Sequence, residues 1–143
     1  MRLEYNILWI DNDLTDYEQN GDVQSIVDFL TEKGFLGRIT PVYDEANLNE
    51  NINSDSDFDL IISDFNLNRE NGDVIIYRIR KEMGISTEIL FYSAKNNFIS
   101  DNPEVKERLA FMERISFYEG RTGLMDKIER VIDLTLKKLL DIN

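Results

Sequence analysis

The stretch Phe58-Asp-Leu-Ile-Ile-Ser-Asp64 decides the fold of this chain. Its three consecutive apolar residues, Leu60–Ile62, are typical of a strand that is buried on both faces, as in parallel sheets. The carboxyl end of such a strand opens onto the ligand crevice of the sheet, where we expect Asp64 to lie. A second apolar run, Ile7–Ile10, ends in the same way, in Asp11-Asn-Asp13. Two strand ends that both carry carboxylates predict a divalent-cation site or a carboxylate nucleophile.

Strands and helices are predicted to alternate along the chain. The apolar and β-branched runs predict strands over Tyr5–Ile10, Arg38–Tyr43, Leu60–Ser63, Glu88–Tyr92 and Ile115–Tyr118. Helical periodicity and stop signals predict helices over Asp16–Lys33, Glu45–Ile52, Val74–Met83, Pro103 to about Arg114, and Leu124–Leu140. Five strand–helix pairs indicate an α/β fold with a doubly wound, five-stranded parallel sheet. We expect residues 1–143 to form a single domain, because no repeat or linker divides them.

The composition excludes several classes of function. The 28 acidic and 16 basic residues give a formal net charge of −12, and such a surface repels the phosphates of DNA and RNA. Because cysteine and histidine are absent, the chain offers no thiol or imidazole for catalysis or metal binding. We find no signal peptide, and no apolar stretch approaches the roughly 20 residues that span a membrane. We therefore expect a cytoplasmic protein that binds neither nucleic acid nor membrane directly.

The carboxylates at the two strand ends suit a hard cation. Magnesium takes oxygen ligands, usually one or two carboxylates together with water and phosphate oxygens. Asp11, Asp13 and Asp64 would supply such oxygens, and a carboxylate beside the cation can attack phosphorus to form an acyl phosphate. The simpler alternative is that Asp11 caps the first helix and Asp64 caps the loop after its strand, because aspartate is a good cap.

The last two predicted strands add further candidates. Ser93-Ala-Lys95 puts a hydroxyl and an ammonium group at a third strand end, where both can bind phosphoryl oxygens. The alternative for these residues is an ordinary polar loop. Tyr118, near the end of the fifth predicted strand, is either a core aromatic or a mobile switch.

Taken together, these residues resemble the receiver domain of two-component response regulators over nearly the whole chain. The most specific part is the segment 58–80, FDLIISDFNLNRENGDVIIYRIR. In it Gly72 follows Asp64 by eight residues, as the family's glycine follows its phosphorylated aspartate. The segment TEILFYSAK is similar to the family's fourth strand, with Ser93 at the switch hydroxyl. The segment YNILWIDND resembles the family's first strand with its acidic pocket.

The resemblance implies a flavodoxin-like (βα)5 receiver fold and a signalling phosphoacceptor that is not an enzyme, although it could dephosphorylate itself. A partner histidine kinase or phosphotransfer protein would phosphorylate Asp64. Ser93 would then move inward, Tyr118 would follow, and a downstream protein target would recognise the changed surface. The implied Mg²⁺ ligands are Asp11, Asp13, Asp64 and the main-chain carbonyl of Asn66. The implied phosphate-binding cations are Arg121 and Lys95.

The sequence departs from the family pattern at three positions. The second of the family's two adjacent acids is Asn12 here, which removes one negative charge from the pocket. The family's lysine at the end of strand five is absent: aligning the last helix by its apolar face puts Arg121 there, and a shift of two residues puts Glu119 there. The proline often found after strand three is Asn68. The chain is therefore either a divergent receiver or a pseudo-receiver, an interaction module that works without phosphate.

A phosphatase is the competing prediction. The run Asp11-Asn-Asp13-Leu-Thr15 fits the Asp-x-Asp-x-Thr motif of haloacid dehalogenase-type phosphatases. Asp11 would then be the nucleophile and Asp13 the general acid, with Ser93 and Lys95 binding phosphate. Those enzymes usually need a later acidic pair, and the sequence has no convincing one after Lys95.

Overall fold

The protein is built on five parallel strands. The computed structural model describes residues 3–95, 98–110, 112–120 and 122–141. The strands lie in the order β2-β1-β3-β4-β5. Their bounds are β1 Leu3–Ile10, β2 Phe35–Val42, β3 Leu60–Asp64, β4 Ile89–Ser93 and β5 Ile115–Glu119. The predicted doubly wound, five-stranded parallel sheet is confirmed.

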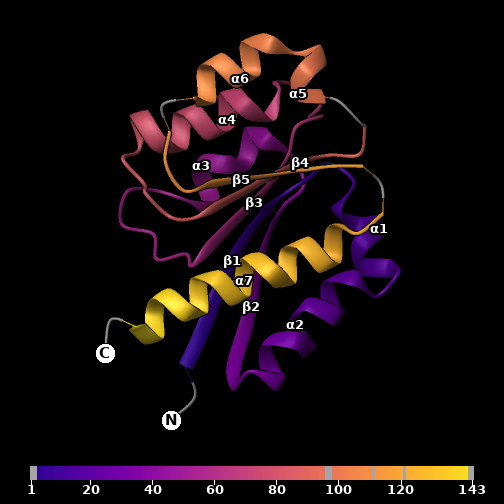
Figure 1. Ribbon diagram of the computed structural model, residues 1–143, viewed down its shortest axis with the longest axis vertical. Coiled ribbons are helices and arrows are strands. Elements are labelled where there is room, and N and C mark those ends of the chain that lie inside the picture. The colour runs from indigo at the N-terminus through magenta and orange to yellow at the C-terminus, as the bar shows by residue number, and fades with distance from the viewer. Residues whose placement is uncertain (1–2, 96–97, 111, 121, 142–143) are drawn as a thin grey trace.

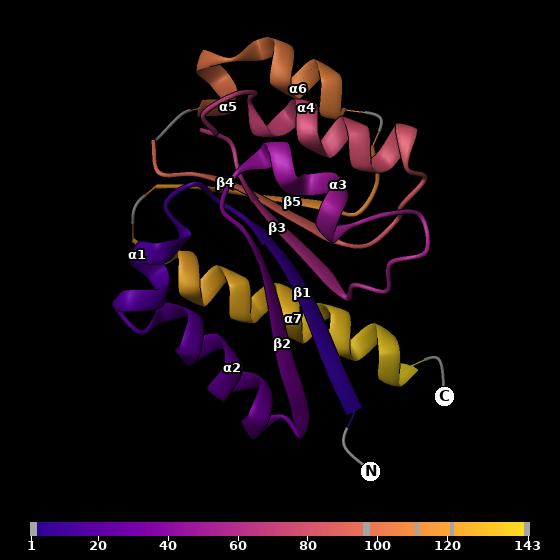
Figure 2. The ribbon, with the colours of Figure 1, turned by 180° about the vertical axis from the view of Figure 1, so that it is seen from behind.

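Helices cover both faces of the sheet. They are α1 Leu14–Gln19, α2 Asp22–Glu32, α3 Leu48–Asn51, α4 Gly72–Tyr77, α5 Phe98–Asp101, α6 Pro103–Leu109 and α7 Leu124–Asp141, with a 3₁₀ turn η1 at Glu45–Asn47 and a π turn η2 at Arg78–Glu82. Helices α1, α2 and α7 lie on one face, and α3, α4, α5 and α6 lie on the other (Figures 1 and 2). Among the described residues, no helix is both long and apolar enough to cross a lipid bilayer.

The central strands are buried on both sides, as their continuous apolar runs predict. Leu60 and Ile62 of β3 point into a cluster under α2 and α7, together with Trp9 of β1. Ile61, between them, points into the opposite cluster under α4 and α6. Alternation along each strand therefore assigns every side chain near the strand ends to one of two faces. We call them the α7 face and the α4 face.

The helix predicted over Asp16–Lys33 is two helices. Gly21, between α1 and α2, has a left-handed φ of 89°, a conformation that a helix interior does not allow and that glycine adopts readily. The second strand also begins three residues earlier than predicted, at Phe35. Phe35, Leu36 and Gly37 are all in register with residues of β1, so the ladder continues through the glycine.

The second half of the chain differs in its helix ends. The helix predicted from Pro103 to about Arg114 stops at Leu109, and Arg114 itself has a φ of 60°, outside the helical region. The helix predicted over Val74–Met83 begins at Gly72 and turns from α-helix to π-helix after Tyr77. Helix α5 was not predicted, because its four residues are too few to show helical periodicity.

Candidate functional site

The sheet reverses its strand order at β1, and ligands of open α/β sheets bind at such a switch point. From β1 the chain passes outward to β2 and then returns to β3 on the other side. Ile10 of β1 is in register with Ser63 of β3, so both strands end at the same level. Asp11 follows Ile10 and Asp64 follows Ser63, so the two aspartates lie next to each other at the switch point.

Asp64 ends β3 and is partly buried. Burial, and then repulsion from the neighbouring Asp11 carboxylate, raises the pKa of Asp64 to about 7. The backbone N–H groups of Phe65 and Asn66 act in the opposite direction, and the Asn66 N–H lies 3.3 Å from Oδ1 of Asp64. Asp64 is thus a carboxyl group that changes charge near neutral pH when no cation is bound.

Asp11 is more deeply buried, with only 2% of its surface exposed. Its Oδ1 accepts a hydrogen bond of 2.7 Å from the backbone N–H of Asp13, and its Oδ2 accepts one from the hydroxyl of Tyr92. Burial raises the pKa of Asp11, and these two donors oppose the rise. Both carboxylate oxygens are therefore held in fixed directions beside Asp64.

The third predicted acid, Asp13, lies at the rim. Its side chain is exposed, and it precedes α1 without making a side-chain capping bond. In the described ranges, which contain all three acids, no three Asp, Glu, His or Cys side chains converge as a metal-binding group. The three acids lie at one end of the sheet, as the sequence predicts, but only Asp11, buried, and Asp64, partly buried, form a pair away from the rim.

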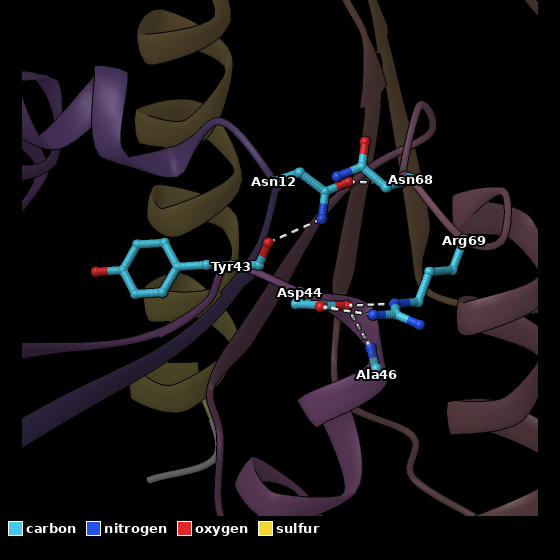
Figure 3. A network of polar contacts seen from close by, with 6 residues as sticks. All are labelled: Asn12, Tyr43, Asp44, Ala46, Asn68 and Arg69. Atoms are coloured by element: carbon cyan, nitrogen blue, oxygen red, sulfur yellow. Dashed lines mark hydrogen bonds and ion pairs between the residues drawn. The ribbon is translucent and has the colours of Figure 1, made fainter.

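Asn12 ties three loops together (Figure 3). Its Nδ2 donates to the carbonyl of Tyr43 after β2 over 2.8 Å, and its Oδ1 accepts from the backbone N–H of Asn68 after β3 over 2.7 Å. Beside it, Arg69 pairs with Asp44 over 3.1 Å. We call the two hydrogen bonds of Asn12 the loop tie. The nitrogen and the oxygen of the Asn12 side chain therefore both have partners in the loop tie. Receiver domains usually have an acid at this position, whose carboxylate contributes an oxygen to the pocket.

Ser93 lies at the end of β4, fully buried. Its Oγ accepts hydrogen bonds from Nδ2 of Asn66 over 3.1 Å and from the backbone N–H of Lys95 over 3.2 Å. The side chain of Lys95 is exposed. Arg121 lies outside the described residues. The predicted hydroxyl is therefore joined to the loop that follows Asp64 through the side chain of Asn66.

The structure contradicts the predicted pairing of Ser93 with Tyr118. Ser93 shares the α4 face with Phe91, whereas Tyr118 pairs with Tyr92 and packs into the α7-face cluster. The hydroxyl of Tyr118 is also bound to the carbonyl of Thr122. The aromatic residue of β5 on the face of Ser93 is Phe117, which is 40% exposed and has its ring 6.1 Å from that of Phe91. Tyr118 is therefore not beside the serine that it was expected to follow.

Sequence reasoning also missed Tyr92. Its side chain runs from β4 along the α7 face to Asp11 at the end of β1, with β3 between the two strands. The only available signal was a hydroxyl-bearing aromatic residue at the end of an otherwise apolar strand. That signal does not say which partner the hydroxyl finds.

Solved structures of known proteins share the fold of this chain. No family model and no curated protein matches this chain. Solved structures match well: a two-component response regulator from Clostridium difficile has a TM-score of 0.67 at 18% identity, over 95% of this chain and 98% of that one. The chain has the fold of response-regulator receiver domains. The receiver fold also aligns with a signal receiver domain from an HD domain-containing protein of Pseudomonas fluorescens (TM-score 0.64, 15% identity, 94% and 96% covered).

A third similar structure was solved with ligands. Response regulator protein TrrA from Thermotoga maritima, in complex with Mg²⁺ and BeF, has a TM-score of 0.63 at 16% identity, over 92% of this chain and 98% of that one. At these identities the similarity establishes the receiver fold and leaves the chemistry of the site to be argued from this chain's own residues.

Proposed function

We propose that this protein is a phosphoacceptor receiver domain that is phosphorylated on Asp64. A histidine kinase or phosphotransfer protein would donate the phosphoryl group: a bond forms between a carboxylate oxygen of Asp64 and phosphorus while the donor's bond to phosphorus breaks. One observation carries the proposal. In a receiver fold, Asp64 is the less buried member of an acidic pair, and the Ser93 hydroxyl is joined to its loop through Asn66.

The residues present fit a bound magnesium ion. Burial, and then repulsion from Asp11, raises the pKa of Asp64, and a divalent cation would offset both effects on the carboxylate. The carboxylates of Asp11 and Asp64 and the main-chain carbonyl of Asn66 would hold the ion, with Asp13 adding negative charge from the rim. When bound, Mg²⁺ neutralises charge on the carboxylates and on the phosphoryl oxygens.

The sequence also fits two other functions, and the geometry of the site bears on each. A phosphatase that uses Asp11 as nucleophile is disfavoured, because both oxygens of Asp11 are hydrogen-bonded and the side chain is almost fully buried. A pseudo-receiver is favoured by one observation: the amide of Asn12 serves the loop tie at the position where the family has an acid. The experiment below separates all three.

The test is to incubate the protein with a small phosphodonor such as acetyl phosphate and Mg²⁺, and to measure its intact mass. The wild type should gain one phosphoryl group, Asp64→Asn should gain none, and Asp11→Asn should gain less than the wild type. Labelling of Asp64→Asn together with none of Asp11→Asn would establish the phosphatase. A folded wild type that stays unlabelled would establish the pseudo-receiver.

The proposed magnesium site makes a prediction about Asn12. In Asn12→Asp a carboxylate oxygen would replace the donor that now faces the carbonyl of Tyr43, so we expect that bond of the loop tie to break at a cost of about 1–2 kcal/mol, while the other oxygen can still accept from Asn68. The freed carboxylate adds negative charge to the pocket, so Mg²⁺ should bind about tenfold more tightly by titration calorimetry. Asn12→Ala is the control, because it also loses the bond to Tyr43, together with the one from Asn68, without adding charge. If both variants bind Mg²⁺ equally, position 12 does not contribute to the cation site.

The net charge indicates the kind of partner. A domain with a charge of −12 should bind a kinase or a downstream target through a basic surface, with an association rate that falls as salt is added. The exposed Phe117 on β5 supplies apolar surface on the face of Ser93.

A further inference from the structure

A buried chain of hydrogen bonds joins Trp9 of β1 and Tyr92 of β4 to Asp11 of the acidic pair. Nε1 of Trp9 donates to the hydroxyl oxygen of Tyr92 over 3.0 Å, and the hydroxyl of Tyr92 is bound in turn to Oδ2 of Asp11. Trp9 is fully buried and Tyr92 is 3% exposed. Water therefore has little access to any of these contacts.

The chemistry of the groups fixes the direction of donation. An indole N–H can only donate, so the hydroxyl oxygen of Tyr92 accepts from Trp9. The single hydroxyl proton of Tyr92 is then left for Asp11, whose ionised carboxylate can only accept. The chain runs from Trp9 through Tyr92 to Asp11, and every buried polar atom in it has a partner.

The position of Tyr92 in the sheet links these hydrogen bonds to Asp64, the proposed phosphoacceptor. Tyr92 of β4 is in direct register with Asp64 of β3, and its side chain reaches Asp11, the residue that follows β1 on the far side of β3. Asn12, the neighbour of Asp11, carries no charge, and its amide is hydrogen-bonded in the loop tie. Asp11 is therefore the buried carboxylate that acts most strongly on Asp64. The group that orients Asp11 therefore sets the geometry of the acidic pair.

We infer that Tyr92 is a positioning residue of this site, which holds Asp11 in place and transmits changes in Asp11 to Trp9. The inference deepens the proposed function and rests on it for the part that concerns magnesium. It makes Trp9 a built-in reporter of the pocket, although the indole does not touch Asp11 directly. Removing the hydroxyl of Tyr92 leaves two buried groups, Nε1 of Trp9 and Oδ2 of Asp11, without this partner.

The first experiment uses metal-free protein. Trp9 is the only tryptophan, so its indole N–H gives a single NMR resonance. Asp11→Asn should shift this resonance in the wild-type background, and the shift should be several-fold smaller when Tyr92→Phe is also present. Equal shifts in the two backgrounds would overturn the inference. If Tyr92→Phe does not fold, Asp11→Asn alone decides: an unmoved Trp9 resonance overturns the inference.

Tyr5→Phe is the matched control. Tyr5 is also a buried tyrosine of the α7-face cluster, and its hydroxyl makes one buried hydrogen bond of 2.5 Å, to Thr135. It lies near the start of β1, five residues before the end of that strand. Tyr5→Phe should lower stability less than Tyr92→Phe, because it removes one buried hydrogen bond to a neutral group instead of two, but the response of Trp9 to Asp11→Asn should persist.

The second experiment measures Mg²⁺ binding by calorimetry. Tyr92→Phe should weaken binding about tenfold, as is typical when a residue that orients a metal ligand is lost, while Tyr5→Phe should leave the affinity unchanged. Equal affinities of Tyr92→Phe and wild type would refute the positioning role while leaving the proposed function intact. If the wild type binds neither Mg²⁺ nor phosphoryl groups, the proposed function fails, and the metal-free experiment still decides the role of Tyr92.

Discussion

Asp64→Asn should stabilise the metal-free protein, by an amount that grows as the pH rises from about 4 to about 7. The carboxyl of Asp64 has an ordinary pKa of 3.8 in the unfolded chain and about 7 in the folded protein. Between these values the folded state keeps a proton that the unfolded state loses, so the free energy of unfolding falls as the pH rises. Above about pH 7 the penalty is complete. Because Asp64 is only partly buried, we expect it to be on the order of 2 kcal/mol.

Urea denaturation of wild type and Asp64→Asn from pH 4 to pH 8, without divalent cations, measures this difference. Asp55→Asn, on an exposed loop, is the control for the loss of one surface carboxylate and should give a curve parallel to the wild type. Parallel curves for Asp64→Asn would contradict the raised pKa of Asp64, which burial and then repulsion from Asp11 produce. Millimolar Mg²⁺ should reduce the advantage of Asp64→Asn, because a cation stabilises only the protein that keeps the carboxylate pair.

The sheet could be predicted from sequence because its strands are short, apolar and well separated. Leu60–Ile62 is buried in the sheet as its composition predicts, and Asp64 ends that strand. Helix ends were predicted less well, since they depend on local backbone angles. Gly21 divides a periodic helix, and Arg114 adopts a positive φ. The residue types at these positions and beside them do not by themselves predict these backbone angles.

The acidic pair could be predicted for the same reason, because both acids directly follow apolar strands. The contacts around it could not, because they join segments that are distant in sequence. Tyr118 was assigned as the switch aromatic from the family resemblance, with the last helix aligned by its apolar face. Only the register of β5 against β4 shows that Tyr118 faces the side opposite Ser93. The partner of Tyr92 is 81 residues away, and the loop tie of Asn12 spans 31 residues to Tyr43 and 56 to Asn68.

Among the described glycines, Gly72 is the one where an added methyl group should cause the largest loss of stability. A Cβ at Gly72 would overlap the backbone oxygen of Asp64 and lie 2.8 Å from Cε1 of Phe91. Neither group can withdraw, because one is backbone at the end of a central strand and the other is a fully buried ring. We expect a loss of about 4 kcal/mol or more, a large part of the stability of a typical domain.

Gly84→Ala is the control that separates space from backbone angle. Gly84 has a φ of 69° and nothing within 4 Å of an added Cβ, so alanine there should cost only about 1 kcal/mol. At Gly72 the requirement is for space, because the N–H of Gly72 donates to the carbonyl of Phe65 over 2.8 Å and brings the start of α4 against the end of β3. Equal losses in the two variants, measured by urea denaturation, would contradict this account. If Gly72→Ala folds at low temperature, its displaced β3 end should also slow phosphorylation, whereas Gly84→Ala should be labelled like the wild type. The eight-residue spacing from Asp64 to Gly72 then has a physical meaning: the glycine lets the next helix begin directly against the backbone of Asp64.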